Sequence, residues 1–396
     1  MQGQPIRRRG FLKAAGAAAA IVAGRPTGAQ AGRLPPLMIE EPFHGAVLNR
    51  RHGEEVDGGL TIRVSGRAPA GEPVTVNGRP AVRAGARFSG EVVLGERETE
   101  IVAASQGAFG AGEHRVRVVW DRHSFPRYRF SVDDNSFFLR DIAAKQYPSL
   151  FDCWYLKIFQ DLHVKYGARF VLNVYYGTED GFELPQFPDR YRSEWLDNAD
   201  WLSLAFHAHA NKPDRPYQYA SPGQLIADLD QVAEEIRRFA GEATYSPPTV
   251  IHWGMVQPTA LKPLAERGVR VLSGDFRRRG HGWDINYFLD ADRSEYLSRH
   301  DALMDFASGI VFSSIDIVCN NTPLDRVVPT LEPLADDPGR AEIMDLFTHE
   351  QYFWPFYSRH LPDHAQRLDA AIRWVTEHGY KPVLFHEGFL GAPDRS

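Results

Sequence analysis

Cysteine is almost absent from this sequence, because only Cys153 and Cys319 occur among its 396 residues. Two cysteines exclude a disulfide framework and a cysteine-rich zinc site, and the sequence leaves open whether they pair. Basic residues show no excess either: 45 Lys and Arg stand against 51 Asp and Glu, for a net charge of -6. A broadly basic surface that binds nucleic acid is therefore not expected.

Long apolar runs and several common catalytic motifs are also missing. No apolar run reaches the length of about 20 residues that a membrane-spanning helix needs. The sequence contains no H-E-x-x-H zinc motif, no G-x-S-x-G nucleophile elbow and no glycine–lysine phosphate loop. His349-Glu350 and His386-Glu387 begin like the zinc motif, but neither has the second histidine. The familiar zinc-protease, α/β-hydrolase and P-loop signatures are thus excluded.

Residues 1–31 are predicted to be an export signal. Arg8, Arg9 and the following Gly10–Lys13 resemble the twin-arginine motif of bacteria. A short apolar run, Ala14–Gly24, comes next, and Ala29–Ala31 has the small residues of a cleavage site. We expect export by the twin-arginine route to the periplasm or the extracellular space.

Residues 32–121 are predicted to form a small all-β module. Short runs rich in β-branched residues, such as Leu60–Val64 and Val116–Val119, are separated by glycine turns. Asn77-Gly78 is a strong signal for a tight hairpin. The pattern is similar to bacterial immunoglobulin-like β-sandwiches and indicates a spacer or a module on the carbohydrate side.

Residues 122–396 are predicted to form a second domain, in which strands alternate with helices. The candidate strands are Tyr128–Asp134, Arg169–Tyr176, Trp201–His209, Thr249–Trp253, Val269–Ser273, Ile343–His349 and Pro382–His386. A helix with an N-cap at Ser221 and a stop at Gly241 lies between two of them. This alternation predicts a parallel α/β fold closed into a (β/α) barrel of about seven strands. Residues 276–340 are less regular and are predicted to form long loops with a hairpin.

Histidine is plentiful, with 15 residues, and its placement is the main functional clue. The histidines at predicted strand ends are His207, His209, His252, His349 and His386. In β/α barrels the reacting groups lie at the carboxyl ends of the strands. A single such histidine is most often a hydrogen-bonded structural residue, but several at strand ends indicate a shared site.

Two adjacent carboxylates, Asp133 and Asp134, end the first candidate strand of this domain. They repel each other inside a compact site, and a metal cation relieves that repulsion. On a regular strand they point to opposite faces, so both serve one site only if the chain turns there. His207 and His209 share one strand face at a spacing that suits chelation. These residues predict a metal site, and packed or solvated histidines are the structural alternative.

Four segments resemble, in order, the motifs of the polysaccharide deacetylase family of metal-dependent carbohydrate esterases. The segments are Phe130–Asp134, Phe206–Asn211, Thr249–Gly254 and Leu346–His349. The resemblance implies a deacetylase-like barrel, a divalent metal cofactor (expected to be zinc) and a polysaccharide or oligosaccharide substrate. The implied reaction is the removal of acyl groups, acetyl above all.

The resemblance also implies a role for individual residues. Asp133 corresponds to the general base of the family and His349 to its general acid. The residues expected to shape the substrate pocket are His252, Trp253, His386 and Glu387.

The implied metal ligands include Asp134 and His207. The family has a second histidine four residues after the first, and Asn211 occupies that position here. The third ligand is therefore left open between His209 and Asn211. This departure from the motif leaves room for different chemistry on the same scaffold.

Two other functions stay open at the level of sequence. A glycoside hydrolase or lyase would use a pair of carboxylates drawn from Asp133, Glu350 and Glu387, about 5–10 Å apart. A carbohydrate-binding protein would have the same fold but no catalytic activity. Released acetate, shortened oligosaccharides or binding without turnover would distinguish the three.

Overall fold

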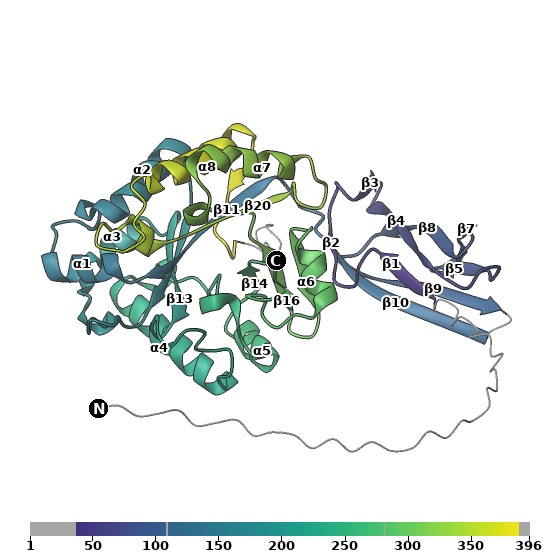
Figure 1. Cartoon of the computed structure of the whole chain (residues 1–396), viewed down its shortest axis with the longest axis horizontal. Helices are drawn as coiled ribbons and strands as arrows, with labels where there is room; N and C mark the ends of the chain where they lie inside the picture. Colours follow the sequence, from purple (N-terminus) through teal and green to yellow (C-terminus); the bar gives the residue numbers. More distant parts are fainter. Residues whose placement is uncertain (1–36, 108–109, 281, 388–396) are drawn as a thin grey trace, which may run out of the picture. The chain divides into compact units, whose positions relative to one another are not determined.

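The computed structural model describes residues 37–107, 110–280 and 282–387 (Figure 1). The expected export signal lies outside these residues. Within the described ranges, every helix is too short or too polar to cross a membrane. Cys153 and Cys319 are both buried and are not disulfide-bonded.

Residues 37–120 form two five-stranded sheets, in which nearly all neighbouring strands are antiparallel. The first contains β1 (Met38–Glu41), β3 (Gly53–Val56), β4 (Gly59–Arg67), β7 (Val82–Ala84) and β8 (Arg87–Leu94). The second contains β2 (Val47–Leu48), β5 (Val74–Val76), β6 (Arg79–Pro80), β9 (Glu98–Gly107) and β10 (Gly110–Trp120). Asn77 and Gly78, both with positive φ, join β5 to β6, so the expected hairpin is confirmed. Burial alternates along β4, as expected where one face of a sheet meets a core.

The rest of the described chain is built around a six-stranded sheet in which all neighbouring strands are parallel. Its order is β13 (Leu202–Ala208), β12 (Phe170–Tyr175), β11 (Arg127–Asn135), β20 (Ile343–His349) and β19 (Ile317–Val318), with β21 (Lys381–Pro382) beside β11. Every residue of β12 and β13 is buried, which is typical of parallel strands covered on both faces. The predicted parallel sheet alternating with helices is therefore confirmed.

Helices surround the sheets of this part of the chain. They are α1 (Phe137–Lys145), α2 (Trp154–Tyr166), α3 (Arg192–Asp197), α4 (Pro222–Phe239), α5 (Pro258–Glu266), α6 (Ala291–Leu297), α7 (Val327–Ala335) and α8 (His364–Glu377). α8 contacts α2 and α7, whereas α4 contacts β13 and α5, as Figure 1 shows. The predicted start of α4 is confirmed, because the Ser221 hydroxyl accepts a hydrogen bond from Gln224 N.

A second, smaller sheet combines the predicted strand Val269–Ser273 with two strands from the stretch that was expected to be mostly loops. It contains β14 (Val271–Gly274), β18 (Ile310–Ser314) and β17 (Ala302–Asp305). The expected hairpin is present as β15 (Arg278–Arg279) and β16 (Gly282–Trp283). The segment after β18 links the two sheets, since Ile315 N donates to Gly274 O and Asp316 N donates to Asp345 O.

The predicted strand Thr249–Trp253 is not a regular strand, although the segment does lie between β13 and β14. Ser273 N, in β14, donates to Thr249 O at 2.8 Å. Pro247 and Pro248 precede the segment and have no N–H to give to a ladder. This irregular segment takes the place of a regular strand between β13 and β14. The described residues therefore do not form a regular seven-stranded barrel.

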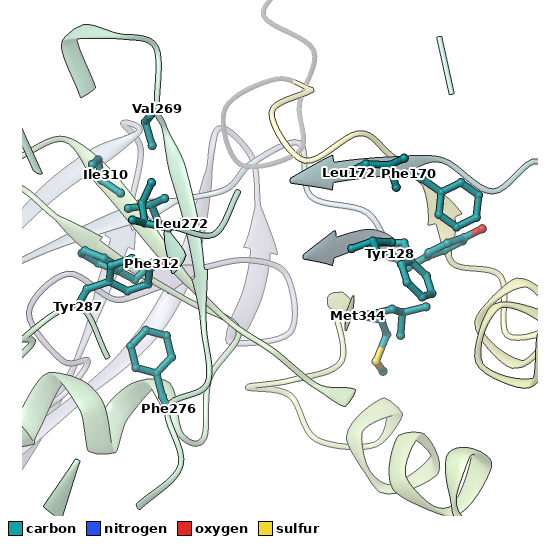
Figure 2. Close-up of a cluster of buried hydrophobic side chains, with 14 of the residues drawn as sticks. Tyr128, Phe170, Leu172, Val269, Leu272, Phe276, Tyr287, Ile310, Phe312 and Met344 are labelled. Atoms are coloured by element: carbon teal, nitrogen blue, oxygen red, sulfur yellow. The ribbon is translucent and has the colours of Figure 1, made fainter. Parts of the chain in front are cut away.

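One large hydrophobic core extends beneath both sheets of the α/β part. Figure 2 shows its side chains from β11, β12 and β20 (Tyr128, Phe170, Leu172 and Met344) and from the smaller sheet and its loops (Leu272, Phe276, Tyr287 and Phe312). Because these strands are fixed by packing, the loops at their carboxyl ends are held on a rigid base.

Candidate metal centre

The end of β11 contains an irregularity that directs two successive carboxylates to one cavity. The pairing of β11 with β12 shifts register between Val132 and Asn135. Asp134 has a φ of 62°, in the left-handed region that non-glycine residues seldom adopt. On a regular strand Asp133 and Asp134 would face opposite ways. Here both line the same cavity.

This cavity has a volume of about 720 Å³ and lies at the carboxyl ends of the parallel strands. Its lining includes Asp133, Asp134, His207, His252 and His349. The strand ends of an open or closed α/β sheet are the usual place for ligands. Asp133 and His349 are directly paired across β11 and β20, which explains how residues so distant in sequence meet.

Three donor atoms in the cavity form a compact group: Asp134 Oδ1, His207 Nε2 and His252 Nδ1. The distance from His207 Nε2 is 3.1 Å to Asp134 Oδ1 and 2.9 Å to His252 Nδ1. His252 Nδ1 lies 3.5 Å from Asp134 Oδ1. An ion with metal–donor distances of about 2.0–2.2 Å holds neighbouring donors roughly 2.9–3.6 Å apart. The separations therefore suit a small divalent cation.

The hydrogen bonding of His207 also fits a cation. Its Nδ1 lies 3.0 Å from Val250 O, and a carbonyl can only accept, so Nδ1 carries the proton. The lone pair of Nε2 then faces the Asp134 carboxylate, another acceptor. Such a contact is favourable when a cation or a proton lies between the two atoms. Burial alone lowers the pKa of His207, but the charges of Asp133 and Asp134 outweigh it and the net pKa is raised.

Burial and mutual charge drive the pKa values of this cluster apart. Burial raises the pKa of Asp133 to about 7, and the charge of Asp134 acts in the same direction. Burial also acts to raise the pKa of Asp134, but the His207 hydrogen bond and the nearby imidazoles hold it well below its usual range. Burial and the charge of His207 lower the pKa of His252 to about 3. Strongly separated pKa values of neighbouring groups are typical of functional sites.

Asp133 is 2% exposed and is fixed by an amide that the sequence analysis missed. Asn173 Nδ2 donates to Asp133 Oδ1 at 2.7 Å and to Thr249 Oγ1 at 2.6 Å. The other carboxylate oxygen of Asp133 lies 3.6 Å from His207 Nε2, beyond hydrogen-bond range. Asp133 thus has one anchored oxygen and one that is free to act in the cavity.

His349 is held in a similar way by Asn320, which the sequence analysis also missed. The His349 Nδ1 lies 2.9 Å from Asn320 Oδ1, so Nδ1 donates and Nε2 is left for other partners. Asn320 itself is buried and lies in the short helical turn Cys319–Asn321, directly after β19. The arrangement fixes the orientation of the imidazole beside the cavity.

Asp134 has two further partners, one at each carboxylate oxygen. The Tyr175 hydroxyl donates to Oδ1, and Gln351 Nε2 donates to Oδ2 at 2.8 Å. Tyr175 is the last residue of β12 and is 3% exposed. Its position at a strand end was the one sign of this role in the sequence. A tyrosine in an apolar strand, however, is more often part of the hydrophobic core.

We expect Tyr175→Phe to weaken metal binding by about 10–100-fold, the usual cost of losing a hydrogen bond to a ligand. The reason is that Asp134 Oδ1 would lose the donor that directs it toward the two imidazoles. Competition with a chromophoric chelator measures the affinity. Tyr176→Phe is the matched control, because the Tyr176 ring stacks on His209 instead, with centroids 4.9 Å apart. Equal affinities for wild type and Tyr175→Phe would contradict this role.

The two residues proposed from the sequence as third ligand, His209 and Asn211, are outside the group of three donor atoms, whereas His252 belongs to it. His209 is exposed, stacks on Tyr176 and is outside the group of three donor atoms. β13 ends at Ala208, so His209 does not share the strand face of His207. Asn211 lines the cavity, and its Oδ1 lies 3.4 Å from the Tyr175 hydroxyl. His252, expected to contact substrate, supplies the third donor atom of the group.

Trp253, which was expected to contact substrate, lines the cavity and is 36% exposed. Its φ of 64° turns the backbone at the end of the extended segment. The guanidinium of Arg215 lies 5.0 Å above the ring and is itself held by two 2.6 Å hydrogen bonds to Asp284. This ion pair fixes Trp253 beside the candidate metal ligands.

His386 and Glu387 do not reach the cavity. The short strand β21 pairs with Arg127 and Tyr128, the first residues of β11, and the chain leaves the sheet there. Glu387 forms an ion pair with Arg169, which directly precedes β12. His386 donates from Nε2 to a backbone carbonyl at 3.1 Å. Both residues therefore lie near the amino ends of the strands, away from the other predicted site residues.

Glu350 has a structural role that the sequence did not reveal. Its carboxylate accepts hydrogen bonds from the backbone N–H groups of Ser136, Phe137 and Phe138, at 2.5–2.8 Å. These are the unpaired donors at the start of α1, and a carboxylate there is strongly favoured. Of the three carboxylates considered for glycoside cleavage, only Asp133 lines the cavity.

Comparison with solved structures finds remote similarity to two carbohydrate-active enzymes. A 4-alpha-glucanotransferase from Thermococcus litoralis matches 66% of this chain and 40% of its own, with 13% identity and a TM-score of 0.43. A family 4 acetyl xylan esterase from Clostridium thermocellum, in complex with a cobalt ion, matches 66% of this chain and 88% of its own. Its identity is also 13%, and the TM-score is 0.35.

The chain thus spans less than half of the glucanotransferase. No protein-family model and no curated protein matches the sequence. At such low identity and TM-score, neither enzyme assigns an activity or a substrate to this chain, and the function has to be inferred from the geometry of the cavity.

Proposed function

We propose that this protein is a metal-dependent hydrolase that removes acyl groups, acetyl above all, from a carbohydrate. The observation that carries the proposal is the group of Asp134, His207 and His252, with Asp133 and His349 on the same cavity. Two imidazoles and a carboxylate are the donors that zinc and similar divalent ions prefer in catalytic sites. We therefore propose zinc as the resident ion.

Asp133 and His349, beside the candidate metal ligands, support a hydrolytic mechanism. A divalent cation, when bound, lowers the pKa of water and polarises a carbonyl. Asp133 accepts the proton of the attacking water through the oxygen that Asn173 leaves free. Burial lowers the pKa of His349, so the resting imidazole is neutral, with its proton on Nδ1. As negative charge develops, His349 takes up a proton from solvent at Nε2 and passes it to the departing sugar oxygen or nitrogen while that atom's bond to the acyl carbon breaks. The proton held by Asp133 is released to solvent, which restores both residues.

A carbohydrate substrate is supported by the lining of the cavity and by the order of the four motifs. Polar and charged groups alternate there with aromatic rings, including Phe137, Trp253, Tyr352 and Tyr357. Sugars offer hydroxyl groups to the former and C–H faces to the latter. Export by the twin-arginine route belongs to the same proposal, since extracellular glycans are reached only outside the cytoplasm.

Metal analysis of the purified protein tests the first part of the proposal. Wild-type protein is expected to bind about one equivalent of a divalent ion and to lose it to a chelator. Asp134→Ala is expected to bind less than a tenth of that amount, because a direct ligand is gone. Asp214→Ala is the matched control, since Asp214 also lines the cavity but pairs with Lys212 at the surface. Metal content that survives both chelation and Asp134→Ala would refute the site.

Product analysis tests the second part. Metal-loaded protein incubated with acetylated polysaccharides is expected to release acetate and to leave the chain length unchanged. Shortened oligosaccharides would instead support a glycoside hydrolase or lyase. Binding without turnover under every metal supplement would support a carbohydrate-binding protein.

A further inference from the structure

A group of aromatic side chains with two exposed members lies next to the cavity. It consists of Phe137, Trp154, Trp354 and Phe356, and is called the aromatic platform below. Trp154 and Phe356 are exposed, Phe137 is half-buried, and Trp354 is buried. Phe356 is 60% exposed and Trp154 is 38% exposed, which is unusual for rings of this size. Leaving such apolar surface in water is unfavourable, and contiguous exposed apolar patches commonly mark binding sites.

The platform is held in place by its own contacts. The Phe356 ring lies 5.1 Å from Phe137 and 5.5 Å from Trp354, and Trp354 lies 4.8 Å from Trp154, measured between ring centroids. The guanidinium of Arg140 lies 5.1 Å above Phe137 and 5.6 Å above Phe356. Exposed rings fixed in this way lose little conformational entropy when a ligand binds.

The platform continues directly into the cavity. Phe137 lines the cavity and is also the first residue of α1, three residues after Asp134. Phe356 lies in the segment that follows His349, and Tyr352 and Tyr357 of that segment line the cavity too. Phe137, Trp354 and Phe356 thus belong to the same two segments that carry residues of the candidate site, and Trp154 joins them from the start of α2. Glu350 joins these segments, because its carboxylate accepts the N–H of Phe137.

We infer that the platform is a subsite for the sugar rings that adjoin the acylated unit in a polysaccharide chain. The inference rests on the proposed function, and it adds that the substrate is a polymer longer than the cavity itself holds. The cavity is lined by ionisable groups, among them Asp275, Arg279 and Arg359, which would disfavour a lipid. A polysaccharide offers hydroxyl groups to the polar cavity and C–H faces to the aromatic rings, so it can contact both surfaces at once.

Substrate length is the variable that tests the inference. The measurement is kcat/KM of metal-loaded wild type, Phe356→Ala and Trp154→Ala on a small acetyl ester and on acetylated sugars from one unit to a hexasaccharide. On the hexasaccharide each variant is expected to lose about threefold to tenfold, mainly in KM, which is the range one aromatic contact provides. On the small ester the variants are expected to equal wild type. Tyr219→Ala is the control, because Tyr219 is 83% exposed and precedes α4.

The outcomes separate the platform from the proposed function. Equal losses on the ester and the hexasaccharide, or no loss on the hexasaccharide, would overturn the platform while leaving the hydrolase intact. If wild type turns over no sugar, calorimetric titration with the hexasaccharide tests whether the platform binds it. Binding by wild type that weakens in Phe356→Ala would support the platform although the hydrolase proposal had failed. Absence of binding by wild type would overturn it.

Discussion

Replacing Asp133 with asparagine is expected to lower kcat by about 10²–10⁴-fold, the contribution typical of a positioned general base. The metal is expected to stay bound, because Asp133 is outside the group of three donor atoms. Asparagine keeps the shape of the side chain and an oxygen that can accept the 2.7 Å hydrogen bond from Asn173. The variant therefore removes the base and leaves the packing of a residue that is 2% exposed.

Turnover of acetylated substrate and metal content, measured on the same preparation, check this expectation. Asp214→Asn makes the same chemical change at the same cavity, but at a surface ion pair, and is expected to behave like wild type. Near-normal kcat in Asp133→Asn would remove this residue from the mechanism. Loss of metal together with activity would instead make Asp133 a ligand.

The parts of the fold that could be predicted are those in which apolar runs are long and continuous. β11, β12, β13 and β20 all coincide closely with predicted strands, because parallel strands buried on both faces leave that pattern. β17 and β18 were missed, since runs of only three apolar residues, Ala302–Met304 and Ile310–Phe312, cannot be distinguished from a buried loop by periodicity. The apolar residues of Thr249–Trp253 predict a strand, but the two preceding prolines have no N–H to give to a ladder, and the segment is irregular.

The candidate site was predictable wherever a polar residue ended a buried strand. Asp133, Asp134, His207 and His349 were found in this way, and all four line the cavity. Asn173, Tyr175 and Asn320 were not, because each acts by hydrogen bonding to another site residue and that pairing depends on tertiary structure. His386 and Glu387 followed the same rule but lie elsewhere, since β21 is only two residues long and ends before them.

The third ligand is where the sequence and the geometry differ most. A spacing of i, i+2 places His207 and His209 on one face only while the strand continues, and β13 ends at Ala208. His252 reaches the group from the extended segment after β13, and its Nδ1 lies 2.9 Å from His207 Nε2. The turn at Trp253, with positive φ, ends that segment beside the cavity. The sequence predicts that His252 lies at the cavity, but the close approach of its Nδ1 to His207 depends on tertiary structure.

Replacing His252 with alanine is accordingly expected to reduce metal affinity by more than about 100-fold, beyond the cost of losing a hydrogen-bond partner of a ligand. His209→Ala is expected to retain wild-type affinity, because that imidazole is exposed and stacks on Tyr176. Titration of both apo variants with zinc compares their metal affinities. Thermal unfolding shows that each variant is folded. Loss of metal in His209→Ala with retention in His252→Ala would restore His209, one of the two candidates for third ligand that the sequence suggested. Loss in His252→Ala alone would establish His252 as the third ligand, contributed by a different segment from the one that carries His207.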